Sequence, residues 1–218
     1  MLQVYGHPLS SYCWKVFVAL RELGLDYELQ QLDPDHPEIG AEFARRWPIA
    51  KMPLLVDGDL QFAESSVIVE YADLLAGGGR LIPADPVAAL HVRFLDRMFD
   101  QYVMAPMQAF TVDFLRPAGA KDPYGIAQAR ALLDKAYAWL ETNLPTTGWA
   151  AGERPTLADC AAAPSLYYAD KVHPLAGRFP ALETYLARLI AWPAFAGVVA
   201  DAQPYWHMFP FADGPPPD

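Results

Sequence analysis

The chain has 218 residues, and 53% of them are hydrophobic, which is enough to bury the core of one large domain or two small ones. Its 26 acidic and 16 basic residues give a formal net charge of -10, so we expect neither nucleic acid nor an anionic membrane as a partner. No apolar run approaches the roughly 20 residues that span a bilayer, and the first residues lack the pattern of a secretory signal. Cys13 and Cys160 are too few for a disulfide framework and too far apart for a local metal motif. We therefore expect a cytoplasmic protein without a metal ion.

The first third of the chain alternates between the periods of strands and helices. Strands are predicted at residues 2–6, 27–32, 53–56 and 60–62, and helices at residues 10–23, 37–46 and 65–75. The resulting order βαβαββα is that of a thioredoxin-like α/β domain.

The pattern changes after residue 77. Three glycines at residues 77–79 end a helix, and Pro83 and Pro86 bracket a stretch with the composition of a linker. We predict a thioredoxin-like domain at residues 1–77 and an all-helical domain at residues 86–218. Only helical periodicity follows, at residues 87–109, 125–144, 156–170, 181–191 and 194–202, before an ending at residues 213–218 that is predicted to be disordered.

The most informative segment spans residues 51–73. Pro53 opens a short apolar strand, a position that suits a residue without an N–H group. A cis bond before Pro53 would leave the N–H and C=O groups of Met52 free for a ligand. Glu64 and Ser65 then open a helix, and we expect Ser65 to cap it with amides pointing outward. Together these features predict a binding site for a carboxylate-bearing peptide. An ordinary hairpin followed by a capped helix would have the same sequence pattern, so this alternative stays open.

This combination resembles the glutathione transferase superfamily, in which a strand begun by cis-proline and a Glu–Ser pair hold the tripeptide glutathione. The resemblance implies that Met52, Pro53, Glu64 and Ser65 bind glutathione as a co-substrate. It also places Lys51 on the lysine or glutamine that contacts the glycine carboxylate in the tau and zeta classes. A surface lysine beside a loop needs no function, so both interpretations of Lys51 stay open.

Glutathione chemistry requires a thiolate, and an ordinary thiol with a pKa of about 8.5 is only slightly ionised at neutral pH. Alignment of Val16 with the theta, delta and zeta classes puts Ser10 on their thiolate-stabilising serine. The segment SSYCWKV also resembles the zeta-class motif SSCxWRV, with Tyr12 in place of the cysteine. Ser10 is therefore the first candidate for the catalytic hydroxyl.

Other side chains near the first helix remain alternatives. Ser11 is the next hydroxyl, and either serine could serve only as a helix cap. Tyr5 matches the region of the catalytic tyrosine in the alpha, mu and pi classes, but a tyrosine in an apolar strand is more often packed core. Cys13 is offset from the nucleophile of glutaredoxins and omega-class proteins, and a cysteine within a helix is usually a small buried hydrophobe.

The helix predicted at residues 87–109 carries an apolar stripe. Phe99, Val103, Pro106 and Phe110 recur at helical spacing beside Tyr102, and Pro106 is expected to kink the helix. The resemblance places this helix across a cleft from the first domain, which makes Tyr102, Pro106 and Phe110 candidates for the acceptor pocket. A stripe that is plain core would have the same pattern.

A second motif lies in the helical half. Thr156 and Asp159 have the spacing of a capping box. The motif resembles the capped helix buried at the centre of the C-terminal domain of glutathione transferases.

The resemblance implies a serine-type glutathione transferase similar to bacterial theta and zeta members, which detoxifies as a homodimer. The expected reaction is attack of the thiolate on an apolar electrophile, or a glutathione-dependent isomerisation or peroxide reduction. Two alternatives remain: a non-catalytic glutathione-binding or regulatory protein of the same fold, and a thiol oxidoreductase that uses Cys13.

Overall fold

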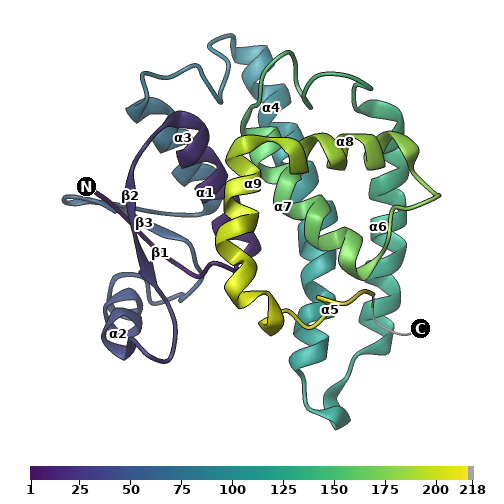
Figure 1. Ribbon diagram of the computed structural model, residues 1–218, viewed down its shortest axis with the longest axis horizontal. Coiled ribbons are helices and arrows are strands. Elements are labelled where there is room, and N and C mark those ends of the chain that lie inside the picture. The colour runs from purple at the N-terminus through teal and green to yellow at the C-terminus, as the bar shows by residue number, and fades with distance from the viewer. Residues whose placement is uncertain (216–218) are drawn as a thin grey trace.

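The computed structural model describes residues 1–215, in which a strand-containing domain lies beside a domain of longer helices (Figure 1). The fold class predicted from the sequence is confirmed in both halves. Within the described residues, no single helix is long and apolar enough to span a membrane. One pair of helices, Pro180–Ala191 and Pro193–Met208, meets these criteria when the two are taken together, and the pair is bent by 78°.

The first domain has the predicted βαβαββα order. Its sheet runs β2-β1-β3-β4, with β1 parallel to β2 and antiparallel to β3, and β3 antiparallel to β4. Its elements are β1 (Leu2–Gly6), α1 (Ser11–Leu23), β2 (Tyr27–Gln31), α2 (Pro37–Arg46), β3 (Leu54–Asp57), β4 (Leu60–Ala63) and α3 (Ser65–Leu75).

Alternation along the strands gives the sheet two apolar faces. Val4 and Leu55 join the main core with α1 and α3. Tyr5 and Leu54, each one residue away along its strand, pack with Phe43 of α2 in a second, smaller cluster. Successive side chains of a strand point to opposite faces, so the sequence period decides which helix each residue meets.

Helix α1 lies between the sheet and the helical domain (Figure 1). Its N-cap is Ser10, whose hydroxyl oxygen accepts the N–H of Cys13 at 3.4 Å. It ends at Gly24, which has a φ of 70° and donates its N–H to Arg21. Most of its residues between these caps are buried, so α1 forms part of both domains' cores.

The stretch with linker composition is held in place by hydrogen bonds. The buried carboxylate of Asp73 accepts the N–H groups of Gly79, Arg80 and Leu81 at 2.9, 3.0 and 2.7 Å. The carbonyl of Leu81 then accepts the N–H of Leu157 at 3.0 Å. These bonds fix the direction in which the chain enters the helical domain.

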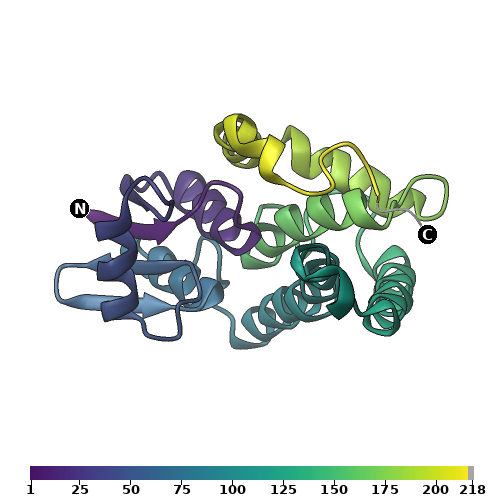
Figure 2. The ribbon, with the colours of Figure 1, turned by 90° about the horizontal axis from the view of Figure 1, so that it is seen from below.

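The helical domain packs around α7, which contacts both α1 and α4 (Figure 2). Burial along nearly the whole length of α7 explains its weak apolar periodicity. The helices are α4 (Pro86–Phe99), α5 (Ala105–Leu115), α6 (Pro123–Asn143), α7 (Leu157–Val172), α8 (Pro180–Ala191) and α9 (Pro193–Ala202), with short turns at Ala118–Ala120 and Gln203–Met208.

One predicted helix is interrupted. Instead of a single helix at residues 87–109, a π-helical turn at Asp100–Met104 separates α4 from α5, and α5 continues to Leu115. Pro106 is the second residue of α5, and its missing N–H removes an ordinary helical hydrogen bond at this point. The N–H of Ala105 bonds to Asp100, five residues back, which widens the turn. The expected irregularity near Pro106 is therefore present as a π-turn.

The capping box at the start of α7 is confirmed. The fully buried carboxylate of Asp159 accepts the N–H of Thr156 and of Ala150, each at 2.8 Å, and the hydroxyl of Tyr185 at 2.6 Å. Burial raises the pKa of Asp159, and these hydrogen bonds oppose that rise. The motif thus ties three segments of the helical domain together.

The C-terminal segment folds back onto the domain boundary. Trp206 stacks on Trp14 of α1 with ring centroids 6.3 Å apart, and Phe209 packs edge-on against Tyr168 of α7 at 5.1 Å. Of the ending predicted to be disordered, residues 213–214 form a turn and a bend, and residues 216–218 lie outside the described residues.

Candidate active site

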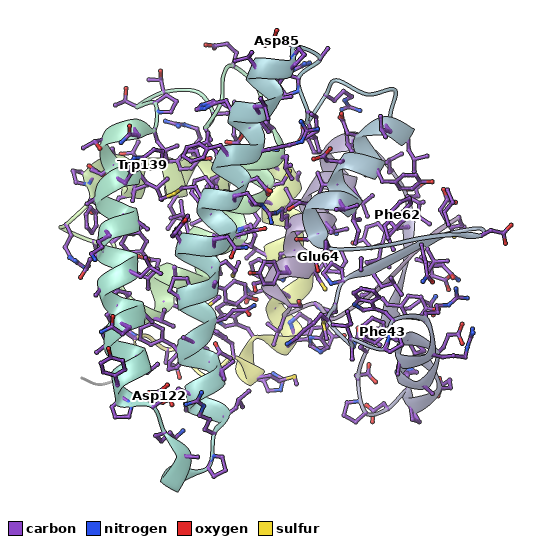
Figure 3. The ribbon with its side chains drawn as sticks, turned by 180° about the vertical axis from the view of Figure 1, so that it is seen from behind. Phe43, Phe62, Glu64, Asp85, Asp122 and Trp139 are labelled. Carbon is purple, nitrogen blue, oxygen red and sulfur yellow. The ribbon has the colours of Figure 1, made fainter. Side chains whose placement is uncertain are left out.

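A cavity of about 660 Å³ opens between the two domains. Ser10, Lys51, Met52, Pro53, Glu64 and Ser65, which were predicted from three separate sequence segments, all line it. Figure 3 shows Glu64 where the sheet domain meets the long helices. The fold therefore brings these candidates into one site.

Met52 lies at the entrance to β3. The Met52–Pro53 peptide bond is cis, as predicted. The strand begins one residue later than predicted, at Leu54, which pairs with Tyr5 on one side and Ala63 on the other. Met52 precedes this ladder and lines the cavity.

Glu64 has an unusual backbone conformation. Its φ is 67° and its ψ is 113°, and a non-glycine residue in such a region costs on the order of 1 kcal/mol or more. The prediction that Ser65 caps α3 is wrong, because Glu64 occupies the N-cap position and Ser65 is the first helical residue. The Glu64 side chain makes no capping bond, so its carboxylate is available to the cavity beside the first amides of α3.

The hydroxyls near α1 differ in their surroundings. Ser10 lines the cavity, and its hydroxyl accepts the N–H of Cys13 in one long hydrogen bond and also lies against the Cys13 thiol. Ser11 is buried, and its oxygen accepts the side-chain amide of Gln108 at 3.2 Å. Tyr5 is buried against Phe43 of α2 and is not among the residues described as lining the cavity.

Cys13 does not suit thiol chemistry. Its side chain is fully buried, and burial raises the pKa of the thiol to about 11. Its sulfur lies against Gly6, where even an added Cβ atom would come within 2.6 Å. A low-pKa, accessible thiol is what an oxidoreductase would need, so the alternative based on Cys13 is wrong.

The three candidates for the acceptor pocket lie elsewhere. Pro106 and Phe110 are buried in the helical core. Tyr102 is exposed and lines a separate hollow with Trp139 of α6, which Figure 3 shows on the far side of the helical domain from Glu64. The whole stripe of Phe99, Val103, Pro106 and Phe110 is buried, which confirms the alternative interpretation that it is plain core.

Other side chains of α4, the π-turn and α5 face the cavity. Gln101 and Gln108 both line it, and they are seven residues apart, close to two helical turns. This polar spacing in an otherwise apolar stretch is the sequence signal that could have indicated the cleft-facing side. A second hollow of about 250 Å³ adjoins the cavity at Ser10 and is lined mainly by apolar side chains of α5, α7 and the C-terminal segment, among them Met107, Val112, Tyr168 and Phe209.

A buried charged cluster lies beneath the cavity, and the sequence analysis missed it. Lys15 of α1 is 1% exposed, and its ammonium contacts Asp100 at 2.8 Å, Ser66 at 2.8 Å and Asp96. Arg97, which lines the cavity, pairs with both aspartates. Burial raises the pKa of Asp100, while the charge of Lys15 lowers it. A single lysine inside the apolar run of α1 was the available signal.

The cavity presents charges of both signs. Lys51 and Arg97 are cationic, whereas Glu64 and Asp100 are anionic. A ligand that carries carboxylates together with an ammonium group matches such a lining better than a ligand of one sign.

The sequence matches two protein-family descriptions in tandem: glutathione S-transferase, N-terminal domain, over residues 4–80, and glutathione S-transferase, C-terminal domain, over residues 123–188. The chain belongs to the glutathione S-transferase family. The family and the fold implied by the resemblance are confirmed, and these matches support the enzyme class that it implies, a glutathione-dependent transferase or isomerase.

Individual relatives cover nearly the whole chain. A probable maleylacetoacetate isomerase of Vibrio cholerae is 30% identical over 93% of this chain and 97% of its own length. The FtsZ-localized protein A of Caulobacter vibrioides is 28% identical, with 92% of each chain covered. A glutathione S-transferase structure from Methylobacillus flagellatus, solved with GSH bound, superposes with a TM-score of 0.82 at 25% identity, covering 91% of this chain and 98% of that one.

Proposed function

We propose that this glutathione S-transferase family member binds glutathione in the cavity between its domains and uses Ser10 to stabilise the thiolate. The observation that carries the proposal is the position of the Ser10 hydroxyl, which lies at the N-terminus of α1 in the same cavity as Met52, Glu64 and Ser65. The thiolate then attacks a small apolar electrophile, in a conjugation or a glutathione-dependent isomerisation.

Glutathione is an extended tripeptide with two carboxylates, one ammonium group and a central cysteine. Met52 offers unpaired backbone groups to the cysteinyl unit. Glu64 suits the ammonium group, while the hydroxyl and N–H of Ser65 suit the adjacent carboxylate at the start of α3. Lys51 suits the glycine carboxylate at the other end.

The chemical role of Ser10 is to favour the charged sulfur. Its hydroxyl donates a hydrogen bond to the thiolate more strongly than to the thiol, and the N-terminal end of α1 adds favourable electrostatics. Both effects lower the thiol pKa from about 8.5 towards neutral pH. The thiol proton leaves to solvent, and the sulfur forms a bond to an electrophilic carbon. The electron pair displaced at that carbon departs with a leaving group, or it moves out of an opened double bond and takes up a proton from solvent. In an isomerisation the double bond reforms as the C–S bond breaks again, which releases glutathione.

The acceptor occupies the smaller hollow beside Ser10 in this proposal. Its apolar lining by Met107, Val112 and Phe209 favours a neutral, apolar compound. Tyr102, Pro106 and Phe110 have no part in it.

We also infer a cytoplasmic homodimer that acts in detoxification. Helices α3 and α4 carry exposed apolar side chains, including Val67 and Leu74 on α3 and Leu90 and Phe94 on α4. An exposed apolar area of this kind suits an isologous interface. Cys13 and Cys160 are both free thiols, which fits a reducing compartment.

The test is a pH titration of thiolate absorbance in the complex with glutathione. Ser10→Ala should raise the bound thiol's pKa by roughly one to two units, the equivalent of a charge-assisted hydrogen bond of about 1.5–3 kcal/mol. Glutathione affinity should change little. Ser11→Ala is the matched control, and a shift in Ser11→Ala without one in Ser10→Ala would move the assignment to Ser11.

A second candidate is a regulatory glutathione-binding protein of the same fold. The similarity to the FtsZ-localized protein A of Caulobacter vibrioides favours keeping it. Tight glutathione binding without turnover, across electrophiles and peroxides, would support this candidate over the enzyme.

A further inference from the structure

The loop between β1 and α1, which leads into Ser10, is held by side chains as well as backbone. The N–H of Ser10 bonds to the carbonyl of His7 at 2.9 Å. The N–H of Leu9 bonds to Nδ1 of the His7 ring at 3.1 Å. These contacts are local and belong to the first domain.

The carbonyls of the same loop are held by two buried aromatic side chains. The indole N–H of Trp14, on α1, donates to the carbonyl of Pro8. The hydroxyl of Tyr168, on α7 of the helical domain, donates to the carbonyl of Leu9 at 2.8 Å. Their ring centroids are 4.8 Å apart, so the two donors form one unit.

Tyr168 is placed to fix the position of the loop before α1, in addition to packing in the core. It is 2% exposed, and burial raises the pKa of its hydroxyl well above the ordinary value, so the hydroxyl remains a donor. Helix α7 is itself fixed at its start by the buried Asp159. The bond to Leu9 therefore connects a rigid helix of one domain to the residue that directly precedes Ser10 in the other.

From this geometry we infer that Tyr168 is a positioning residue for the reaction: its hydroxyl holds the carbonyl of Leu9 and so sets where the Ser10 hydroxyl meets the sulfur of glutathione. This inference rests on the proposed role of Ser10. Thiolate stabilisation depends on the position of the donor, since hydrogen bonds weaken steeply with poor geometry. Loss of the Tyr168 hydroxyl also leaves the part-buried Leu9 carbonyl without that donor, which frees the loop to shift.

The test is Tyr168→Phe, which removes one oxygen and keeps the ring. Tyr168 also lines the acceptor hollow, so the readout is thiolate absorbance against pH in the binary complex with glutathione, where no acceptor is present. We expect the bound thiol's pKa to rise by about half a unit to one unit, consistent with the loss of one hydrogen bond. The Kd of glutathione should stay within about twofold, because the binding groups are untouched.

Two tyrosines provide matched controls. Tyr167, next along α7, packs its ring against Trp14 at 5.4 Å, so Tyr167→Phe should leave the thiol pKa unchanged. Tyr185→Phe removes a buried hydroxyl that bonds Asp159, so it should lower the thermal midpoint without shifting the thiol pKa. Thermal unfolding of every variant separates a loss of stability from a loss of positioning.

The double variant Ser10→Ala/Tyr168→Phe decides whether Tyr168 acts through Ser10. A double variant that titrates like Ser10→Ala alone supports the inference. Additive pKa shifts in the double variant overturn the inference, and so does a Tyr168→Phe variant that titrates like the unmutated protein. In either case a pKa shift in Ser10→Ala still supports the proposed function. If Ser10→Ala itself causes no shift, the role of Ser10 fails, and the inference about Tyr168 fails with it.

Discussion

The two halves of the interdomain site are built in different ways. The proposed glutathione half is made of short backbone features of the first domain: the cis bond before Pro53, the left-handed Glu64 and the cap at Ser10. The proposed acceptor half is made of side chains from α5, α7 and the C-terminal segment, which meet only after the helical domain has packed. Local features leave a sequence signature, whereas an assembled surface leaves little.

The charged cluster beneath the cavity joins α1 of the first domain to α4 of the helical domain, and breaking it should have the largest effect. Lys15→Met leaves Asp96 and Asp100 buried without their main cation, which should lower the free energy of unfolding by about 3–5 kcal/mol. Urea unfolding measures this loss. Arg93→Met, which breaks the partly exposed pair with Glu70, is the control and should cost at most about 1 kcal/mol. Equal losses in the two variants would show that the buried cluster stabilises the fold no more than a partly exposed ion pair does.

The glutathione half can be broken at Glu64. Glu64→Ala should weaken glutathione binding by about 1–3 kcal/mol, the usual range for a hydrogen bond to a charged group, as measured by calorimetry. Glu64→Gly should weaken binding as well and yet stabilise the fold, because glycine adopts a φ of 67° without strain. Unchanged affinity in both variants would remove Glu64 from the binding site.

The location of the acceptor half can be tested with two side chains of similar exposure. Val112 lines the hollow beside Ser10 and is 52% exposed, whereas Tyr102 lines the distant hollow and is 47% exposed. Val112→Ala should raise the KM of an apolar acceptor about fivefold, equivalent to roughly 1 kcal/mol of lost apolar contact. Tyr102→Ala should leave that KM unchanged. The reverse result would restore the acceptor site that the sequence stripe suggested.

The smallest expected effect is a pH dependence of the loop before α1. Burial lowers the pKa of His7 below its ordinary 6.5, while nearby Asp33 opposes the shift. The unfolded chain therefore takes up this proton at a higher pH than the folded chain does. The contribution of neutral His7 to stability should be complete above about pH 6.5 and decline as the pH falls from there towards the lowered pKa.

Replacement of His7 tests this directly. His7→Gln should show a shallower loss of unfolding free energy between pH 7 and pH 5.5 than the unmutated protein. His36 titrates in the same range with its pKa raised by Asp33, so its contribution has the opposite sign, and His36→Gln serves as the comparison. An identical slope in His7→Gln and the unmutated protein would contradict the assignment.

Much of the fold could be predicted because hydrophobic periodicity and caps are local. The bounds of β1, α2 and α3 agree with the predicted ranges, and the capping box at Thr156 and Asp159 forms as expected. The helix predicted at residues 87–109 is present, but it contains the π-turn Asp100–Met104. Periodicity could not indicate this turn, since it assumes a constant rotation per residue.

The sequence by itself determined the family resemblance, the two-domain division and the short motifs that hold glutathione in the proposed site, because each depends on a few consecutive residues and their backbone preferences. Only the tertiary structure decided which side chains of α4 and α5 face the cavity, that Lys15 is buried between two aspartates, and that Tyr168 contacts Leu9, 159 positions away in the sequence. These contacts join residues distant in sequence, and their energies come from burial and pairing that exist only once the domains have packed.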